Sequence, residues 1–263
     1  MLRCIYTTLY SIKVEKKSED TYTFQSDNID LEYMKTDTYK KKGAALRGSI
    51  MIMGPLLTRF KHAYLPKPGG DKIGRRRLDT HFLGFEKLGA KFNYDSNETF
   101  YSVEAGNLHG TYVLLDEPSV TGTANIVMAA SLTPGITTIY NAACEPYLQQ
   151  LCKMLNHMGA KITGIGSNLL TIEGVTSLKG TTHRMLPDMI EIGSFIGMAA
   201  ITNSDITISN CRVDMLGPIP DVFGRLGIQM EIKGDDIRVF GNERYEISSF
   251  IDGSTLTVSD APW

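Results

Sequence analysis

One pattern occurs three times along the chain: Gly84-Phe-Glu-Lys-Leu-Gly-Ala-Lys-Phe92, Met154-Leu-Asn-His-Met-Gly-Ala-Lys-Ile162 and Val222-Phe-Gly-Arg-Leu-Gly-Ile-Gln-Met230. Its central glycines, Gly89, Gly159 and Gly227, are 70 and 68 residues apart. Each copy predicts an amphipathic helix that ends at a glycine, because glycine adopts the left-handed conformation of a helix C-terminus at little cost. The spacing therefore indicates a structural repeat of about 70 residues.

Other elements recur with the same period. Two strands are expected after each of these helices, at residues 91–93 and 99–104, 161–163 and 169–173, and 229–232 and 236–240. A second helix is expected upstream, at residues 48–57, 124–132 and 193–201, followed by a strand at 62–65, 136–141 and 205–210. With one more strand leading in, each unit is predicted to read βαβαββ.

The upstream helices are apolar nearly all round, as in Ile126-Val-Met-Ala-Ala130 and Phe195-Ile-Gly-Met-Ala-Ala200. Such helices are buried, so we expect an α/β (α+β) fold with helices inside and sheets outside. Pro187 is the expected boundary between a first domain of two repeats (1–187) and a partial second domain of one repeat (188–263). Residues 21–42 are expected to form a strand and a polar linker, and residues 245–258 to begin as a further strand.

Composition excludes several classes of protein. The chain has 263 residues, 42% of them hydrophobic and 21% charged, with a formal net charge of −2, which is typical of a globular protein without a general affinity for nucleic acid. No apolar run approaches the ~18–20 residues of a membrane-spanning helix. Four scattered cysteines and five scattered histidines show no metal-ligand spacing, so we expect reduced thiols, a cytoplasmic location and no metal.

A basic loop is expected at residues 67–79, Lys-Pro-Gly-Gly-Asp-Lys-Ile-Gly-Arg-Arg-Arg-Leu-Asp, with a local charge of +3. Arginine side chains and the N-terminus of a following helix make a good receptor for phosphate or carboxylate. A solvated basic loop without a ligand is the alternative. Asp71 lies within this cationic field and should be ionised, so it can donate a proton only when a bound anion offsets those charges.

A second candidate is the hydroxyl-rich loop Asp116-Glu-Pro-Ser-Val-Thr-Gly-Thr123, which leads into a predicted helix. Capping of the helix explains one hydroxyl, and the whole cluster suggests a polar ligand such as a diphosphate. Arg47 at the start of the first repeat helix is a third candidate, although an arginine at a helix entry is usually a surface residue. Asp188 and Glu191 are expected at a helix start, where the helix dipole alone accounts for two acids.

Several further motifs follow in order: Leu46-Arg-Gly-Ser-Ile50, Met53-Gly-Pro-Leu-Leu57, Pro68-Gly-Gly-Asp-Lys-Ile-Gly74, Asn141-Ala-Ala143, Met158-Gly-Ala-Lys161, Ile172-Glu-Gly-Val175 and Leu186-Pro-Asp188. Together they resemble the UDP-N-acetylglucosamine 1-carboxyvinyltransferases, enolpyruvyl transferases that open peptidoglycan synthesis. The 3-phosphoshikimate enolpyruvyl transferases share the fold but fit these motifs less well. The resemblance implies an inside-out α/β barrel of six repeats, incomplete here, and transfer of enolpyruvyl from phosphoenolpyruvate to the 3-hydroxyl of UDP-N-acetylglucosamine without a cofactor.

The resemblance also implies roles for individual residues. Asp71 takes the position of the proton donor, which is usually cysteine, and a thiol-directed epoxide of the fosfomycin type should therefore not inactivate the chain. The implied substrate-binding residues are Arg47, Arg76, Arg77, Leu78, Asp79, Thr80, Ser119, Val120 and Thr121. Arg77 replaces the usual proline, and Thr121 replaces a glycine.

Two features that the resemblance implies are missing from the sequence: an extra first repeat with a Lys-Asn pair, and a catalytic aspartate just beyond Ala261-Pro-Trp263. We therefore expect a truncated enzyme with impaired activity, whose open strand edges favour self-association. A non-catalytic remnant that binds a UDP-sugar or acts as a scaffold is the alternative. Neither nucleic acid nor membrane is an expected partner, because the basic loop is short and lacks interleaved aromatic residues.

Overall fold

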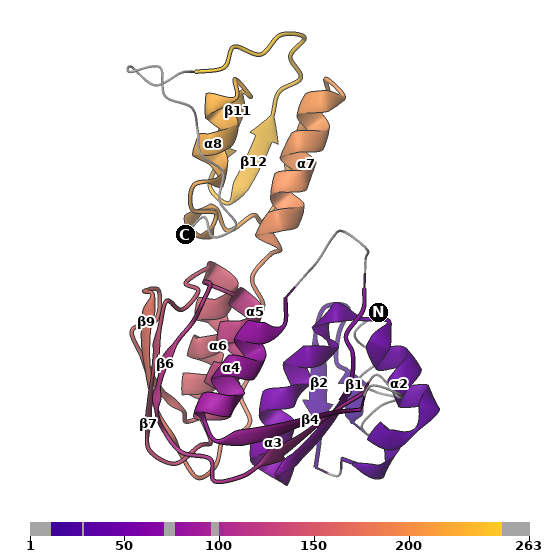
Figure 1. The fold of residues 1–263 in the computed structure, drawn as a ribbon. Coiled ribbons are helices and arrows are strands. Elements are labelled where there is room, and N and C mark those ends of the chain that lie inside the picture. Colours follow the sequence, from indigo (N-terminus) through magenta and orange to yellow (C-terminus); the bar gives the residue numbers. More distant parts are fainter. Residues whose placement is uncertain (1–11, 28, 71–76, 96–99, 249–263) are drawn as a thin grey trace.

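The computed structural model describes residues 12–27, 29–70, 77–95 and 100–248 (Figure 1). Its hydrophobic side chains form two core clusters, one built from residues up to Ile172 and one built from Met189 onward. The domain boundary at Pro187 remains a prediction. Within the described residues, no helix is both long and apolar enough to cross a membrane.

Three sheets repeat one strand order. The first contains β3 (His62–Pro66), β4 (Ala90–Asp95) and β5 (Phe100–Ala105), in the order β3-β5-β4. The second contains β6 (Tyr112–Leu114), β7 (Ile136–Tyr140), β8 (Lys161–Thr163) and β9 (Leu169–Glu173), in the order β6-β7-β9-β8. The third contains β10 (Ile206–Ile208), β11 (Met230–Lys233) and β12 (Asp236–Val239), in the order β10-β12-β11.

In each sheet the last strand of the unit lies in the middle and runs antiparallel to both of its neighbours from that unit. Strand β6 is the additional leading strand, and it pairs with β7 in parallel. The helix–strand–helix–strand–strand part of the predicted repeat is therefore confirmed in three units, with strand bounds that differ from the predicted ones by a few residues at most. The leading strand predicted for each unit joins the sheet only in the second unit: residues 174–188, before the third unit, contain no strand, and β2 (Tyr22–Gln25), before the first, pairs with β1 (Lys13–Lys16) instead.

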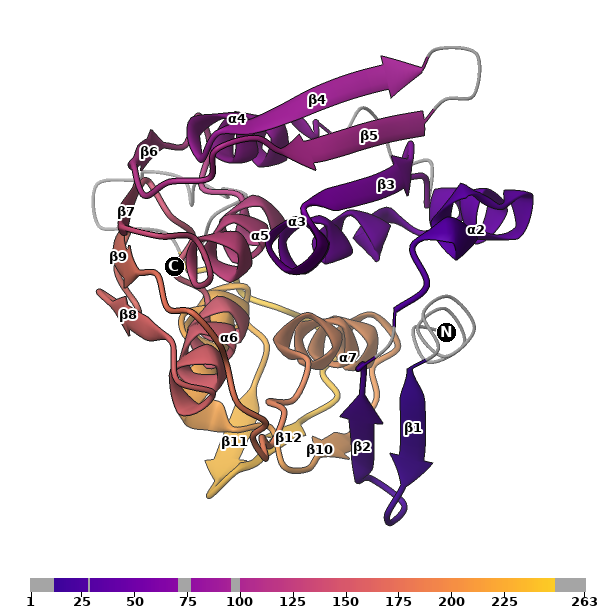
Figure 2. The ribbon, with the colours of Figure 1, turned by 90° about the horizontal axis from the view of Figure 1, so that it is seen from below.

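Helices occupy the inner face of these sheets (Figure 2). The first helices of the units are α3 (Met53–Phe60), α5 (Val120–Ala130) and α7 (Met189–Ile201), and the second helices are α4 (Asp79–Lys87), α6 (Pro146–His157) and α8 (Ile219–Arg225). Helix α5 is the most enclosed: eight of its eleven residues are buried, and it packs against α3, α4 and α6. Its apolar sequence thus buries it as predicted.

The opposite face of the second sheet is open. Tyr112 on β6 and Ile136 and Tyr140 on β7 are exposed, while the residues that alternate with them, such as Ile139, are buried. This alternation is that of a sheet with one face on the core and one face in water.

The prediction for residues 21–42 is confirmed for the strand and wrong for the polar linker after it. Strand β2 (Tyr22–Gln25) is present and pairs with β1 (Lys13–Lys16), but a 3-10 turn, η1 (Glu32–Lys35), and helix α2 (Asp37–Ala44) follow it. The Thr36 hydroxyl accepts a hydrogen bond from the Tyr39 amide and caps α2, and the side chains of Met34 and Tyr39 are buried. Tertiary packing of two apolar side chains therefore orders a segment whose composition is polar.

The predicted helix at residues 48–57 is divided in two. Residues Arg47–Ile52 form the 3-10 helix η2, and α3 begins at Met53. The predicted strand from residue 245 is not present at residues 245–248, where the hydroxyl of Tyr245 donates to the carbonyl of Ala200 at 2.8 Å. The rest of that prediction, residues 249–258, lies outside the described residues.

Candidate functional site

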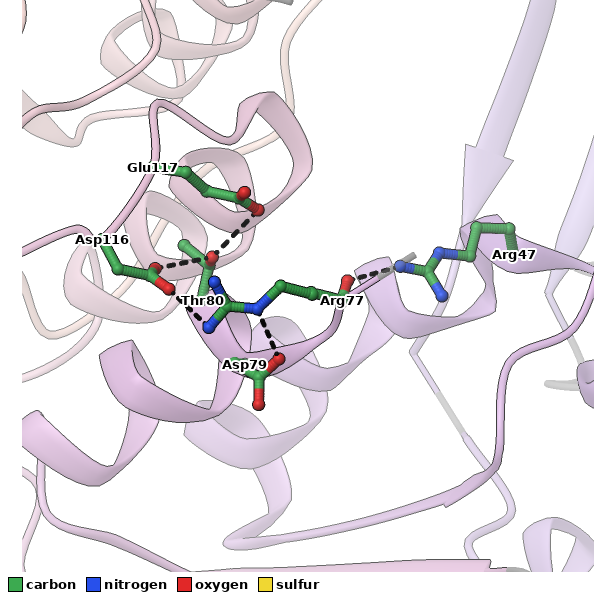
Figure 3. A network of polar contacts seen from close by, with 6 residues as sticks. All are labelled: Arg47, Arg77, Asp79, Thr80, Asp116 and Glu117. Carbon is green, nitrogen blue, oxygen red and sulfur yellow. Dashed lines mark hydrogen bonds and ion pairs between the residues drawn. The ribbon is translucent and has the colours of Figure 1, made fainter. Parts of the chain in front are cut away.

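Two of the predicted binding residues, Arg47 and Arg77, are in direct contact. A guanidinium nitrogen of Arg47, at the start of η2, donates to the backbone carbonyl of Arg77 at 2.5 Å (Figure 3). Arg77 lies two residues before α4. The bond therefore holds the start of η2 against the residues that directly precede α4.

The side chain of Arg77 is shared between two carboxylates. Its Nε atom lies 3.0 Å from Oδ2 of Asp79, and its Nη2 atom lies 2.9 Å from Oδ2 of Asp116 (Figure 3). The hydrogen bond to Asp79, with the charge of Asp116, raises the pKa of the Arg77 guanidinium above its ordinary value. All three side chains are in contact with water, so these pairs orient the arginine more than they stabilise the fold.

Thr80 joins this cluster to the hydroxyl-rich loop. Its hydroxyl is buried and lies 2.9 Å from Oδ1 of Asp116 and 3.3 Å from Oε1 of Glu117 (Figure 3). Glu117 is two residues before Ser119, and the Ser119 hydroxyl accepts the Gly122 amide at 3.2 Å. Two loops that are about 40 residues apart in sequence thus meet at the N-terminal ends of α4 and α5.

The hydroxyl-bearing residues at the N-terminus of α5 differ in exposure and in their hydrogen bonds. Ser119 is the N-cap, Val120 is the first helical residue and half-buried, and Thr121 is exposed. The buried Thr123 hydroxyl is engaged, since it donates to the Ser119 carbonyl at 2.7 Å and accepts from the Ala143 amide at 3.1 Å. The capping interpretation holds for Ser119, which leaves Thr121 as the hydroxyl available to a ligand.

The structure adds two residues that the sequence analysis did not single out, His81 and Asn125. Both side chains are buried. His81 contacts Thr121 through Nε2 at 3.3 Å and Asn125 through Nδ1 at 3.2 Å. One feature of the sequence could have pointed to these residues: Asn125 is an amide side chain in an otherwise apolar helix. It is four residues after Thr121 and therefore lies on the same face of the helix.

Burial and the positive charge of Arg47 lower the pKa of His81 to about 4. The imidazole is therefore neutral at neutral pH. A neutral imidazole can donate through one nitrogen and accept through the other, so it can link two polar groups in a fixed direction.

The remaining predicted residues fall into two groups. The structure brings together Arg47, Arg77, Leu78, Asp79, Thr80, Ser119, Val120 and Thr121 at the starts of η2, α4 and α5. Asp71 and Arg76 lie outside the described residues. Asp188 caps α7 by accepting the amides of Ile190 and Glu191, as its helix-start interpretation predicted.

Cys152 and Cys211 are free thiols, and burial raises the pKa of Cys152 to about 11. In the part of the chain that the structure describes, no group of three or more His, Cys, Asp or Glu side chains is arranged to hold a metal ion.

Comparison with solved structures defines the class of fold. The chain aligns over 93% of its length with the enolpyruvyl transferase NikO from Streptomyces tendae, with a TM-score of 0.77 and 15% sequence identity, and covers 58% of that chain. It aligns over 89% of its length with EPSP synthase from Acinetobacter baumannii, with a TM-score of 0.60 and 17% identity, and covers 54% of that chain. The fold is thus that of enolpyruvyl transferases.

The family follows from sequence. The family model of EPSP synthase (3-phosphoshikimate 1-carboxyvinyltransferase) matches residues 5–260, and the chain belongs to this family. It is 62% identical over 252 residues to a UDP-N-acetylglucosamine 1-carboxyvinyltransferase of Bacteroides thetaiotaomicron, and 60% identical over 252 residues to that of Porphyromonas gingivalis. Each of these alignments covers 96% of this chain and 58% of the relative, so the chain spans little more than half the length of these relatives.

Proposed function

We propose that the chain carries the UDP-sugar-binding part of a UDP-N-acetylglucosamine 1-carboxyvinyltransferase. The observation that supports this most is the 62% identity to relatives of that name, together with the convergence of Arg47, Arg77 and Thr121 at two helix N-termini. Backbone amides at a helix start and arginine side chains suit a diphosphate. In this proposal the repeated units belong to an inside-out barrel with helices inside, and the protein acts in the cytoplasm.

The proposed reaction has two steps. The methylene carbon of phosphoenolpyruvate gains a proton while its C2 atom forms a bond to the 3-oxygen of the sugar, which loses its own proton. The methyl group then loses a proton as the bond from C2 to the phosphate oxygen breaks, and phosphate leaves. The two substrates together are neither oxidised nor reduced in either step, so the proposal requires no redox cofactor.

Asp71 is the proposed proton donor for the methylene group, on the strength of its position in the Pro68-Gly-Gly-Asp motif. Arginine neighbours favour its ionised form, and bound phosphate and carboxylate would offset them. Arg76 is proposed to face the substrate anions. The segment from Arg77 to Thr80 is proposed to surround the uridine, and Ser119 to Thr121 the diphosphate.

We propose as the alternative a UDP-sugar-binding unit that does not catalyse. Phosphate release from phosphoenolpyruvate separates the two candidates, with UDP-N-acetylglucosamine or 3-phosphoshikimate as the acceptor. Release only with the UDP-sugar supports the transferase. Saturable binding of the UDP-sugar without release supports the binding unit, and release with 3-phosphoshikimate instead contradicts both. Self-association through open strand edges would show as a mass above 29.1 kDa in light scattering.

A further inference from the structure

The amide of Asn125 stands between two backbone groups that would bond to one another in a regular helix. Its Oδ1 atom accepts the Gly54 amide at 2.9 Å, and its Nδ2 atom donates to the Ile50 carbonyl at 2.8 Å. In an α-helix the amide of residue 54 would donate to the carbonyl of residue 50. The inserted side chain accounts for the change from η2 to α3 at this point, and it fixes which end of the amide is oxygen.

The orientation of Asn125 sets the tautomer of His81. The second hydrogen on Nδ2 of Asn125 is directed to Nδ1 of His81 at 3.2 Å, so that ring nitrogen must accept. The ring proton of a neutral imidazole then lies on Nε2, which donates to the Thr121 hydroxyl at 3.3 Å. A doubly protonated ring would set an N–H of His81 against an N–H of Asn125.

This chain of bonds ends at the surface. Thr121 is exposed, its oxygen accepts from His81, and its own proton has no acceptor among the residues that the structure describes. The proton therefore remains available to an external acceptor. Thr121 is the second residue of the eleven-residue helix α5, whose first amides also favour an anion.

We propose that Asn125 and His81 are positioning residues that hold the Thr121 hydroxyl as a hydrogen-bond donor to the diphosphate of a bound UDP-sugar. This inference rests on the proposed function and adds two buried residues that do not themselves touch the ligand. It also explains why the polar side chains of Asn125 and His81 are buried between apolar helices. The Asn125 amide replaces the helical bond between Gly54 and Ile50, and it also sets the direction of the hydrogen bond from His81 to Thr121.

The test is a double-mutant cycle on UDP-N-acetylglucosamine binding, measured by calorimetry on the full chain. Thr121→Val removes the hydroxyl and keeps the shape, and we expect it to weaken binding about tenfold. His81→Leu should weaken binding by a similar factor, whereas His81→Gln, whose amide can donate from nearly the same place, should restore most of the affinity. In the Thr121→Val background, His81→Leu should have no further effect, because it acts through that hydroxyl.

Nitrogen NMR of the His81 ring shows which ring nitrogen carries the proton. A residue with only a structural role would not require one particular tautomer. We expect a protonated Nε2 and an unprotonated Nδ1 in the wild-type chain, and retention of this form at about pH 5.5. A ring protonated on Nδ1, or losses that add in the double variant, would overturn the positioning role. If the wild-type chain shows the expected tautomer but binds no UDP-sugar, the proposed function is contradicted. The UDP-sugar is then also excluded as the ligand of the Thr121 hydroxyl.

Discussion

A side-chain nitrogen of Arg47 lies 2.5 Å from the backbone oxygen of Arg77, 30 residues further along the chain. This contact joins the start of η2 to the residues that directly precede α4, and Arg47 lies close enough to His81 that, in addition to burial, its positive charge lowers the pKa of the imidazole. Two segments that the sequence marks separately as candidates are thus in direct contact.

The first prediction concerns Arg47. We expect Arg47→Ala to weaken UDP-N-acetylglucosamine binding about tenfold or more, because a charge-assisted contact and the placement of residue 77 are lost together. Arg47→Lys should recover only part of the affinity, since an ammonium group lacks the planar fork. Calorimetry measures both effects.

Arg238→Ala is the matched control for Arg47. Arg238 makes an exposed two-point contact with Asp205 at 3.0 and 2.9 Å, beside the second core cluster. Its loss should leave UDP-sugar affinity unchanged. If the two variants lose the same UDP-sugar affinity, the effect of Arg47→Ala comes from the change in net charge and not from the position of Arg47.

The second prediction concerns pH. The folded-state pKa of His81 is about 4 against an ordinary value of 6.5, so the unfolded chain binds more protons between these values. Stability should therefore fall as the pH drops from about 6.5 toward 4, by up to about 3 kcal/mol from this residue. His81→Gln lacks the titrating ring, and its free energy of unfolding should fall less over the same range.

Urea unfolding at a series of pH values measures this difference. The comparison between wild type and His81→Gln removes the contribution of the other titrating groups. Parallel profiles for the two proteins would show that His81 titrates normally in the folded state.

The third prediction uses two glycines in helices. A Cβ atom at Gly84 would lie 2.1 Å from Cδ1 of Ile126, a fully buried side chain, whereas a Cβ atom at Gly193 would meet only ordinary contacts at 3.7 Å and beyond. We expect Gly84→Ala to destabilise the chain by about 1–3 kcal/mol through overpacking between α4 and α5.

Gly193→Ala should be neutral or stabilising by up to about 1 kcal/mol, because alanine is the better helix former. Thermal unfolding of both variants provides the comparison. A stable Gly84→Ala would show that α4 and α5 do not approach as closely as the structure has them.

The fourth prediction concerns Asp71. A carboxylate is a far poorer nucleophile than a thiolate, so we expect a thiol-directed epoxide of the fosfomycin type to leave this residue unmodified. Intact-mass analysis after incubation checks this. Asp71→Cys should introduce an adduct of one epoxide, and an adduct at Asp71 in the wild-type chain would refute the prediction.

Much of the fold could be predicted because the repeat shows in the sequence. The glycine-terminated helices and alternating strands follow from local patterns, and the buried helix α5 follows from its apolar composition. Helix α2 was missed because its ordering depends on the burial of Met34 and Tyr39, which is a tertiary effect. The division of the first repeat helix was missed because its cause, Asn125, lies 71 residues from Gly54.

The candidate site could likewise be predicted only in part. Arg47, Arg77 and Thr121 could be selected by residue type and by their positions near helix starts. The pairing of Arg77 with Asp116 and the link from Asn125 through His81 to Thr121 could not, since they join elements that only the folded chain brings together. The sequence alone also does not reveal that a histidine is neutral, because its pKa depends on burial.

Calorimetric titration of UDP-N-acetylglucosamine into the full chain, with 3-phosphoshikimate as the comparison ligand, tests the central claim most directly. We predict saturable binding of one UDP-sugar per chain, weakened by both Arg47→Ala and Thr121→Val, and no binding of 3-phosphoshikimate. Absence of saturable UDP-sugar binding, or binding that neither substitution weakens, would contradict the assignment of the site.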